Sequence, residues 1–229
     1  MNNRIAPYAV WAAYLSGLLA ILSAACLILF FWLEAPLVST AGGPGTHIWG
    51  PLSDIFPIFQ MLSLLVVAFA LYRLERSSTP TASLLTYAIG IIGMLGVSVL
   101  QLFLVIGVIP FEQEVGPVLI ATAVVGVWLI LVNFLAWRQR MLPARMAWLG
   151  MVVGAAILLQ PLLFSLLGGA MNWQNFMSSP LLLIGGTVVF VLSYAGLPAW
   201  LFWLGRTLAA TRRESGWRPA AALAREVTG

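Results

Sequence analysis

Residues 115–138 read VGPVLIATAVVGVWLILVNFLAWR, and no residue from Val115 to Trp137 is charged. A transmembrane helix needs about 20 consecutive, mostly apolar residues, so this stretch is long enough to cross a bilayer. Arg138 follows it directly, and arginine is typical of the cytoplasmic end of a membrane span. The stretch therefore predicts a membrane-spanning helix.

The rest of the chain repeats this pattern. Of its 229 residues, 62% are hydrophobic and 8% are charged, whereas about 25% of the residues of a soluble domain are charged. The uncharged stretches, and a polar turn inside the last of them, predict an all-α protein of six transmembrane helices arranged as three helical hairpins. The expected spans are residues 8–33, 51–73, 83–108, 116–137, 146–168 and 180–206.

The arginines indicate the orientation. The chain has 11 basic residues, and all of them are arginines. When the N-terminus, the loops 73–82 and 138–145 and the C-terminal tail, with Arg206 at the inner end of the last span, are assigned to one side, every arginine falls on that side. The positive-inside rule makes this side cytoplasmic. We therefore expect both termini in the cytoplasm, with residues 207–229 as a basic cytoplasmic tail.

The composition also excludes several kinds of chemistry. Without lysine the chain cannot form a lysine Schiff base. With one histidine and one cysteine it cannot assemble a bis-histidine haem site or a thiolate zinc cluster by itself. We expect no cofactor, no metal and no catalytic residue. Nucleic acid is not an expected partner either, because arginines beside apolar spans set topology.

Small residues mark the faces through which helices in lipid can associate. Ser16, Ala20 and Ala24 recur at a spacing of four in the first span, and Gly150 and Gly154 form a GxxxG pattern in the fifth. Such faces serve either packing inside the bundle or dimerisation. Because one chain supplies six helices, we expect packing inside the bundle.

Three glutamines lie deep in the predicted helices: Gln60, Gln101 and Gln160. Each is about 8 or 9 residues from the expected outer end of its span, or roughly 12 to 14 Å at 1.5 Å per residue. We expect all three on one level and directed inward, because an unpaired amide in lipid costs several kcal/mol. Ser53 begins the same polar stripe near the outer surface. The layer is either hydrogen-bonding glue between helices or the lining of a pocket for a small or amphipathic ligand.

Acidic residues and the single histidine gather at the expected outer rim. Glu34, His47 and Asp54 border the first outer loop, and Glu112 and Glu114 lie in the second. An imidazole with carboxylates can bind a divalent cation or perform acid–base chemistry on a lipid head group. Their spacing matches no metal-binding motif, and a histidine in a Gly/Pro-rich loop is typical of a solvated residue. Asp54 also suits the first turn of a helix, where a negative charge is favourable.

Two stretches carry a resemblance to a known class of proteins. LPARMAWLG at residues 142–150 and LPAWLFWLGR at residues 197–206 resemble parts of bacterial six-helix integral membrane proteins grouped as domains of unknown function. The segment from Gly50 through the third span is similar to them as well. The resemblance implies a bacterial cytoplasmic membrane and supports the topology. It transfers no site residue, because its motifs mark the starts and ends of helices.

Three functions stay open. We expect a non-enzymatic integral membrane protein, acting as an accessory subunit or as a binder of lipid-like molecules in the outer half of the bilayer. The alternatives are a small permease that uses the glutamine layer, and a membrane-embedded enzyme centred on Glu34, His47 and Asp54. The expected partners are membrane lipids, together with a membrane-protein partner or a second copy of the chain.

Overall fold

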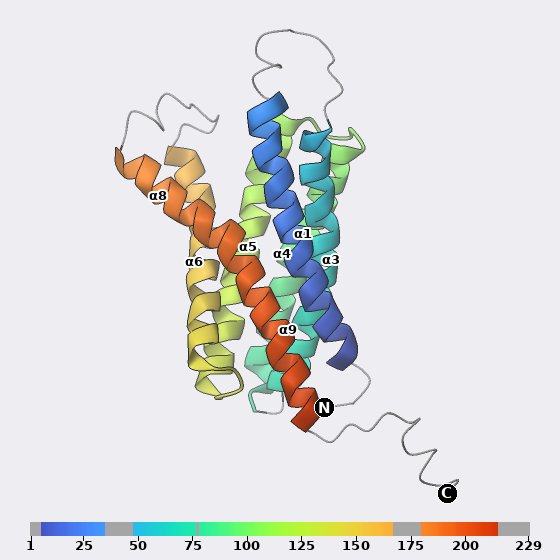
Figure 1. Ribbon diagram of the computed structural model, residues 1–229, viewed down its shortest axis with the longest axis vertical. Helices are drawn as coiled ribbons and strands as arrows, with labels where there is room; N and C mark the ends of the chain where they lie inside the picture. Colours follow the sequence, from blue (N-terminus) through green and yellow to red (C-terminus); the bar gives the residue numbers. More distant parts are fainter. Residues whose placement is uncertain (1–5, 35–47, 77, 167–179, 215–229) are drawn as a thin grey trace, which may run out of the picture.

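The computed structural model describes residues 6–34, 48–76, 78–166 and 180–214, which contain helices and no strand (Figure 1). Six helical segments within these ranges are long and apolar enough to cross a membrane, so the predicted all-α fold is confirmed. The elements are α1 (Ala6–Leu29), η1 (Phe30–Glu34), α3 (Trp49–Glu75), α4 (Pro80–Val105), α5 (Phe111–Arg138), α6 (Ala144–Leu166), α8 (Pro180–Val191), η2 (Leu192–Gly196) and α9 (Leu197–Glu214). The elements η1 and η2 are π-helical turns.

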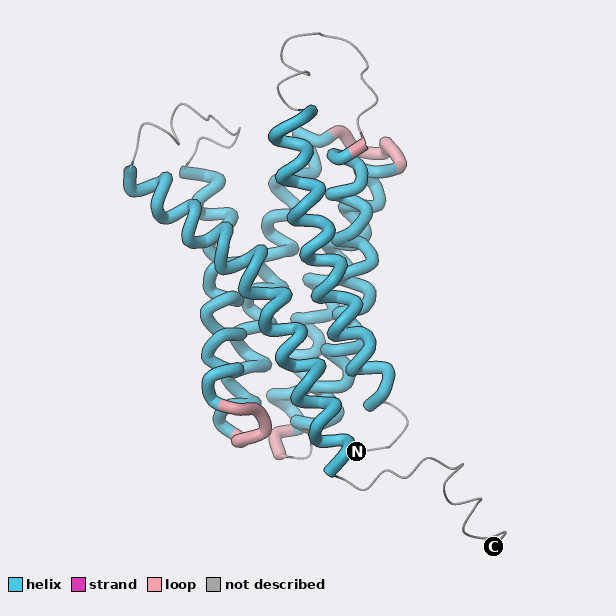
Figure 2. Tube along the Cα trace, viewed as in Figure 1, coloured by secondary structure: helices cyan, strands magenta, loops and turns pink. Residues whose placement is uncertain are grey.

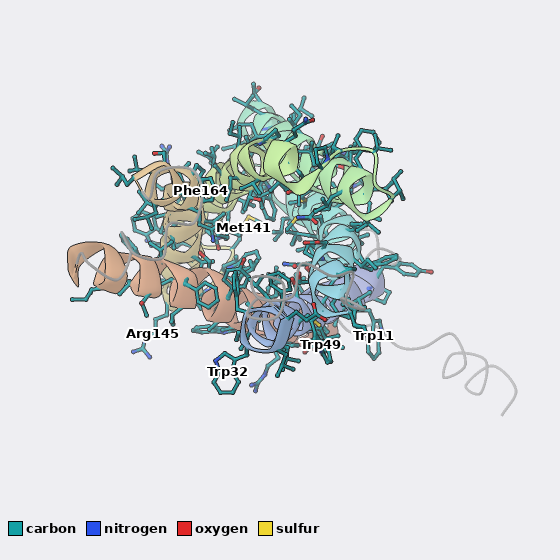
Figure 3. All side chains as sticks on the ribbon, turned by 90° about the horizontal axis from the view of Figure 1, so that it is seen from above. Trp11, Trp32, Trp49, Met141, Arg145 and Phe164 are labelled. Carbon is teal, nitrogen blue, oxygen red and sulfur yellow. The ribbon has the colours of Figure 1, made fainter. Side chains whose placement is uncertain are left out.

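Consecutive helices pack side by side and form a ring. The pairs α1 with α3, α3 with α4, α4 with α5 and α5 with α6 are all in contact, and η2 and α9 close the ring by packing on both α6 and α1. Seen from above, Met141, in the loop between α5 and α6, projects within the outline of the ring, whereas Trp32 and Arg145 point outward (Figure 3). In this order α3 and α5 touch only at a few residues, and α1 separates α3 from η2.

The two ends of the bundle differ in charge. We call the end at which α1 begins and α9 ends the terminal end, and the end at which η1 ends and α3 begins the distal end (Figure 1). The described loops lie at these two ends (Figure 2). The distal end holds the carboxylates of Glu34, Asp54 and Glu114. The arginines of the loops and of the span ends lie at the terminal end: Arg73, Arg76, Arg138, Arg140, Arg145 and Arg206.

Large apolar side chains cover the outside of the ring. Trp11 is 73% exposed, Ile92 67% and Ile120 65%. Large exposed apolar patches are rare on soluble monomers, whereas lipid tails are as apolar as these side chains. The bundle therefore presents a surface that suits the interior of a bilayer.

Two glycines allow α5 and α6 to cross closely. A methyl group on Gly154 would lie 2.7 Å from the carbonyl oxygen of Gly126, and one on Gly126 would lie 2.7 Å from that of Gly154. One turn away, Gly150 faces the Asn133 side chain of α5, which would clash with a methyl group there. The predicted use of the Gly150 and Gly154 pair inside the bundle is confirmed.

A proline determines how α1 and α3 are joined. Pro57 has no N–H, so it cannot bond the carbonyl of Ser53, four residues earlier. The Ser23 hydroxyl of α1 donates to that carbonyl at 3.1 Å. Further along the same pair of helices, the Ser16 hydroxyl donates to the Gln60 carbonyl at 3.3 Å. The serines of α1 thus bind backbone carbonyls of α3, and Ser53 belongs to this helix contact.

Candidate functional site

Glu34 caps the start of α3. Its Oε1 accepts hydrogen bonds from the backbone N–H groups of Ile48 at 2.6 Å and Trp49 at 3.0 Å, and its Oε2 accepts one from Gly50 at 3.2 Å. The first amides of a helix have no partner within the helix, and a negative charge there interacts favourably with the helix dipole. The side chain is buried. The enzyme hypothesis requires the Glu34 carboxylate for chemistry, but both of its oxygen atoms already accept hydrogen bonds from the start of α3.

The predicted place of Asp54 in a first helical turn is wrong. The helix α3 begins at Trp49, two residues before the predicted start, and its first turn holds no acidic residue. Asp54 therefore lies in the second turn. Glu34, from the preceding span, supplies the charge at the helix start instead.

Asp54 lies on the inward side of α3. Its carboxylate interacts electrostatically with the Glu114 carboxyl of α5 and with the Tyr194 hydroxyl of η2. The helix α3 touches α5 directly at a few residues, but it makes no contact with η2. The interaction of Asp54 with Tyr194 therefore runs across the interior of the ring. Three elements therefore direct polar groups into the distal half of the ring.

Glu114 is on a helix rather than in a loop. The predicted start of this span was residue 116, but α5 begins at Phe111, directly after its N-cap Pro110. Glu114 thus lies in the first turn of α5, and its side chain is 2% exposed. The rim position expected for Glu114 becomes an interior position.

Three buried oxygen atoms on α4, α5 and η2 have no hydrogen-bond partner among the described residues. They are Glu114 Oε1, Gln101 Oε1 and Ser193 Oγ. Gln101 lies on α4, between α3 and α5, and Ser193 precedes Tyr194 in η2. A buried polar group left unpaired costs about 1–3 kcal/mol, so such groups are rare in native structures. A bound water or a ligand can supply the missing partner of each.

The three glutamines do not form the expected layer. Gln60, Gln101 and Gln160 lie 11, 4 and 6 residues from the distal ends of their helices, because α3, α4 and α6 begin or end at other residues than predicted. The prediction of a single level is therefore wrong. No hydrogen bond joins two of these glutamines in the described part of the chain, and Gln101 Oε1 has no partner. Gln60 is buried and Gln160 is half-buried.

The distal halves of α1 and α8 do not pack on each other. The helix α9 packs along α1 and η2 touches it, but α8 contacts α6 and η2 without contacting α1 (Figures 1 and 3). The break lies at η2. Pro198 has no N–H for the carbonyl of Tyr194, four residues earlier, and the chain makes a wider π-helical turn there. The last span therefore closes the ring in the terminal half and leans outward in the distal half.

Sequence reasoning missed two buried polar features. The Trp200 indole N–H donates to Asn133 Oδ1 at 3.0 Å, and Asn133 Nδ2 donates to the Leu129 carbonyl at 2.8 Å. Asn133 is the one amide side chain in the uncharged stretch 115–137, which was the available signal. Glu75, which falls within the predicted loop 73–82, is 1% exposed, and its Oε1 has no hydrogen-bond partner among the described residues.

Some predicted site residues fall outside the described part of the chain. These are His47, the side chain of Glu112 and residues 215–229 of the predicted tail. Residues 207–214 belong to α9. Within the described ranges, no three His, Cys, Asp or Glu side chains gather so that they could hold a metal ion.

No protein-family model, curated protein or solved structure matches the chain. Membership of a bacterial six-helix family therefore stays a prediction.

Proposed function

We propose that the chain is a multi-pass protein of a bacterial cytoplasmic membrane with both termini in the cytoplasm. The arginines at the terminal end support this orientation, because cytoplasmic loops carry an excess of Arg and Lys. The carboxylates at the distal end agree with it. In this orientation the distal half of the bundle lies in the outer leaflet.

The protein acts in this proposal as a non-enzymatic binder of a lipid-like molecule, whose head group is held in the distal half of the ring. The observation that carries the proposal is the pair of buried, unpaired oxygen atoms, Glu114 Oε1 of α5 and Gln101 Oε1 of α4, in the distal part of the bundle. The Asp54 carboxylate of α3 interacts electrostatically with Glu114 and with the Tyr194 hydroxyl of η2. Polar side chains that served only as glue would be paired with one another, because partly satisfied buried networks are costly.

The outward lean of α8 supports an amphipathic ligand over a water-soluble one. The ring is unpacked between α1 and α8 toward the lipid. Ile184, Val188 and Val191 of α8 are exposed and offer an apolar surface to an alkyl chain. A ligand can therefore keep its tail among lipids while its head group reaches the interior.

A small permease is the second candidate, and Glu75 is the observation that favours it. This carboxylate is buried at the terminal end of α3, as Asp54 is partly buried near the distal end of the same helix. Ionisable residues inside membrane spans often mark a transport pathway. A permease predicts uptake or export of the bound molecule by vesicles, which a binder does not perform.

Mass spectrometry of the protein extracted together with its surrounding lipids tests the proposal. We expect the wild-type chain to retain one amphiphile above the bulk lipids, and Gln101→Leu to lower its retention at least about fivefold, which corresponds to about 1 kcal/mol. Gln113→Leu is the matched control, because Gln113 is exposed at the same end of the bundle.

Equal amphiphile content in both variants, or no enrichment over bulk lipid in the wild type, would contradict the proposal. A stoichiometric protein partner without any retained amphiphile would favour the accessory-subunit hypothesis instead.

A further inference from the structure

A surface hollow of about 540 Å³, which we call the arginine hollow, lies at the terminal end of the hairpin formed by α5 and α6. It is lined by Trp137, Arg138, Arg140, Leu142 and Ala144. These residues belong to the last turn of α5, the loop that follows it and the first residue of α6 (Figure 2). Two arginines and three apolar residues thus border one space, at the end of the bundle opposite the site proposed above.

The backbone holds Arg140 in an unusual conformation. Among the described residues other than glycine, Arg140 alone has a positive φ, 56°, in the left-handed region that favours glycine. Its N–H donates to the Trp137 carbonyl at 3.0 Å, and the N–H of Met141 donates to the Ala136 carbonyl at 2.9 Å. This pair of bonds commonly ends a helix, usually with glycine at the position of Arg140. An outlier of this kind indicates a role for the side chain.

A side-chain hydrogen bond anchors the chain between the two arginines. Gln139, the residue between them, donates through its Nε2 to Thr79 Oγ1 at 2.7 Å. The bond ties the end of α5 to the loop between α3 and α4. The arginine hollow is therefore formed before a ligand binds, which lowers the entropy lost on binding.

The lining carries positive charge without negative charge. No acidic side chain of the described part lines the arginine hollow, and no residue between Glu114 and Glu214 is acidic. Glu75, at the terminal end of α3, is 1% exposed and does not reach this surface. The positive-inside rule accounts for arginines in this loop, but it requires neither a shared hollow nor a left-handed backbone. Guanidinium groups bind phosphate through paired N–H donors, so the lining suits a phosphate-bearing anion.

Aromatic side chains indicate the level of the arginine hollow in the membrane. The rings of Trp137 and Trp148 lie 5.9 Å apart, and the two side chains are 40% and 55% exposed. Exposed tryptophans are typical of the interface between the lipid tails and water, where lipid phosphates also lie. Phe134, one turn further into the bilayer on α5, is 42% exposed and offers a surface to an acyl chain. These side chains favour a phospholipid over a free phosphate.

We propose that the arginine hollow binds the phosphate of an anionic phospholipid from the leaflet at the terminal end, with Arg138 and Arg140 as the donors. A zwitterionic lipid carries the same phosphate together with a cation, which the arginines repel. The site therefore prefers lipids of net negative charge. It is separate from the site in the distal half and does not depend on the function proposed for that site.

Native mass spectrometry of the full chain in dodecyl maltoside, with dioleoyl phosphatidylglycerol and dioleoyl phosphatidylcholine added in equal amounts, tests the proposal. We expect phosphatidylglycerol to bind at least about fivefold more tightly. Arg140→Gln should remove most of this preference. Arg76→Gln is the matched control, because it removes the same charge from an exposed residue at the same end of the bundle and should leave the preference unchanged.

Arg140→Gly separates binding from folding. Glycine adopts a positive φ without strain, so this variant should unfold at the same dodecyl sulfate concentration as the wild type or at a higher one. It should nevertheless lose the preference for phosphatidylglycerol. Full retention of the preference in Arg140→Gly would overturn the role of the side chain.

Three further outcomes would overturn the proposal. Equal binding of the two lipids by the wild-type chain would show that the arginine hollow does not select a charged lipid. An equal loss of preference in Arg76→Gln would make the effect one of net charge. Adducts of inorganic phosphate that Arg140→Gln removes, without any preference between the lipids, would identify a site for free phosphate instead.

Discussion

Replacing Glu34 with alanine removes three hydrogen bonds from the first amides of α3, at 2.6, 3.0 and 3.2 Å. A hydrogen bond to a charged group contributes about 1.5–3 kcal/mol, but the loss of a helix cap lowers stability by only about 0.5–2 kcal/mol, because freed amides regain water. Glu34 is buried and holds three amides, so we expect the upper part of this range, about 2 kcal/mol. Glu34→Gln keeps one carbonyl oxygen and should lose about half of that.

Hydrogen exchange followed by mass spectrometry measures the effect locally. A loss of about 2 kcal/mol increases the open population about 30-fold, so the amides of Ile48, Trp49 and Gly50 should exchange faster by about that factor. Gln113→Ala is the control at the same end, because Gln113 is exposed. Unchanged exchange of these three amides in Glu34→Ala would refute the capping role.

Three further predictions concern the packing of the ring. For the first two, the midpoint of unfolding in a dodecyl sulfate titration measures the change in stability. Ser23→Ala should lower stability by about 1 kcal/mol, and adding Pro57→Ala should restore most of it, because the new N–H can bond the carbonyl that Ser23 satisfied; simple additivity of the two changes would count against this. Trp200→Phe keeps an aromatic ring but leaves a buried asparagine oxygen unpaired, so it should lower stability by about 1–3 kcal/mol, and an unchanged midpoint would contradict that bond. Gly154→Leu should abolish a monodisperse folded species in size-exclusion chromatography, whereas Gly185→Leu, with no atom within 4 Å, should keep it.

The six spans could be predicted from the sequence, and so could the different charge of the two ends of the bundle. Both depend on local properties of the chain. An apolar stretch of sufficient length has to satisfy its backbone internally in lipid, which a helix does. The residue at which each helix begins depends less on the local sequence. The Gly116–Pro117 pair looked like the start of a span, but proline is tolerated early in a helix, and α5 begins five residues before it. This difference moves Glu114 from a loop into the interior.

The site itself could not be predicted, because it depends on which faces meet across the ring. Asp54, Glu114 and Tyr194 are far apart in the chain, and their approach requires the order of the helices and the lean of α8. The glutamines were predicted as the polar site because amide side chains are rare in apolar stretches and are therefore visible in the sequence. In the structure Gln101 alone among them contributes a buried, unpaired oxygen.

Photolabelling in membranes tests the central claim most directly, namely that an amphiphile binds in the distal half of the ring beside α8. An alkyl probe bearing a diazirine near its head, with an amine or a glycerol head group, is activated by light, and the labelled residues are mapped by mass spectrometry. The account predicts labelling concentrated in η2 and the distal turns of α1 and α3, reduced by an excess of unlabelled probe. Labelling spread evenly over lipid-facing positions such as Ile92 and Ile120, and unaffected by competition, would contradict it.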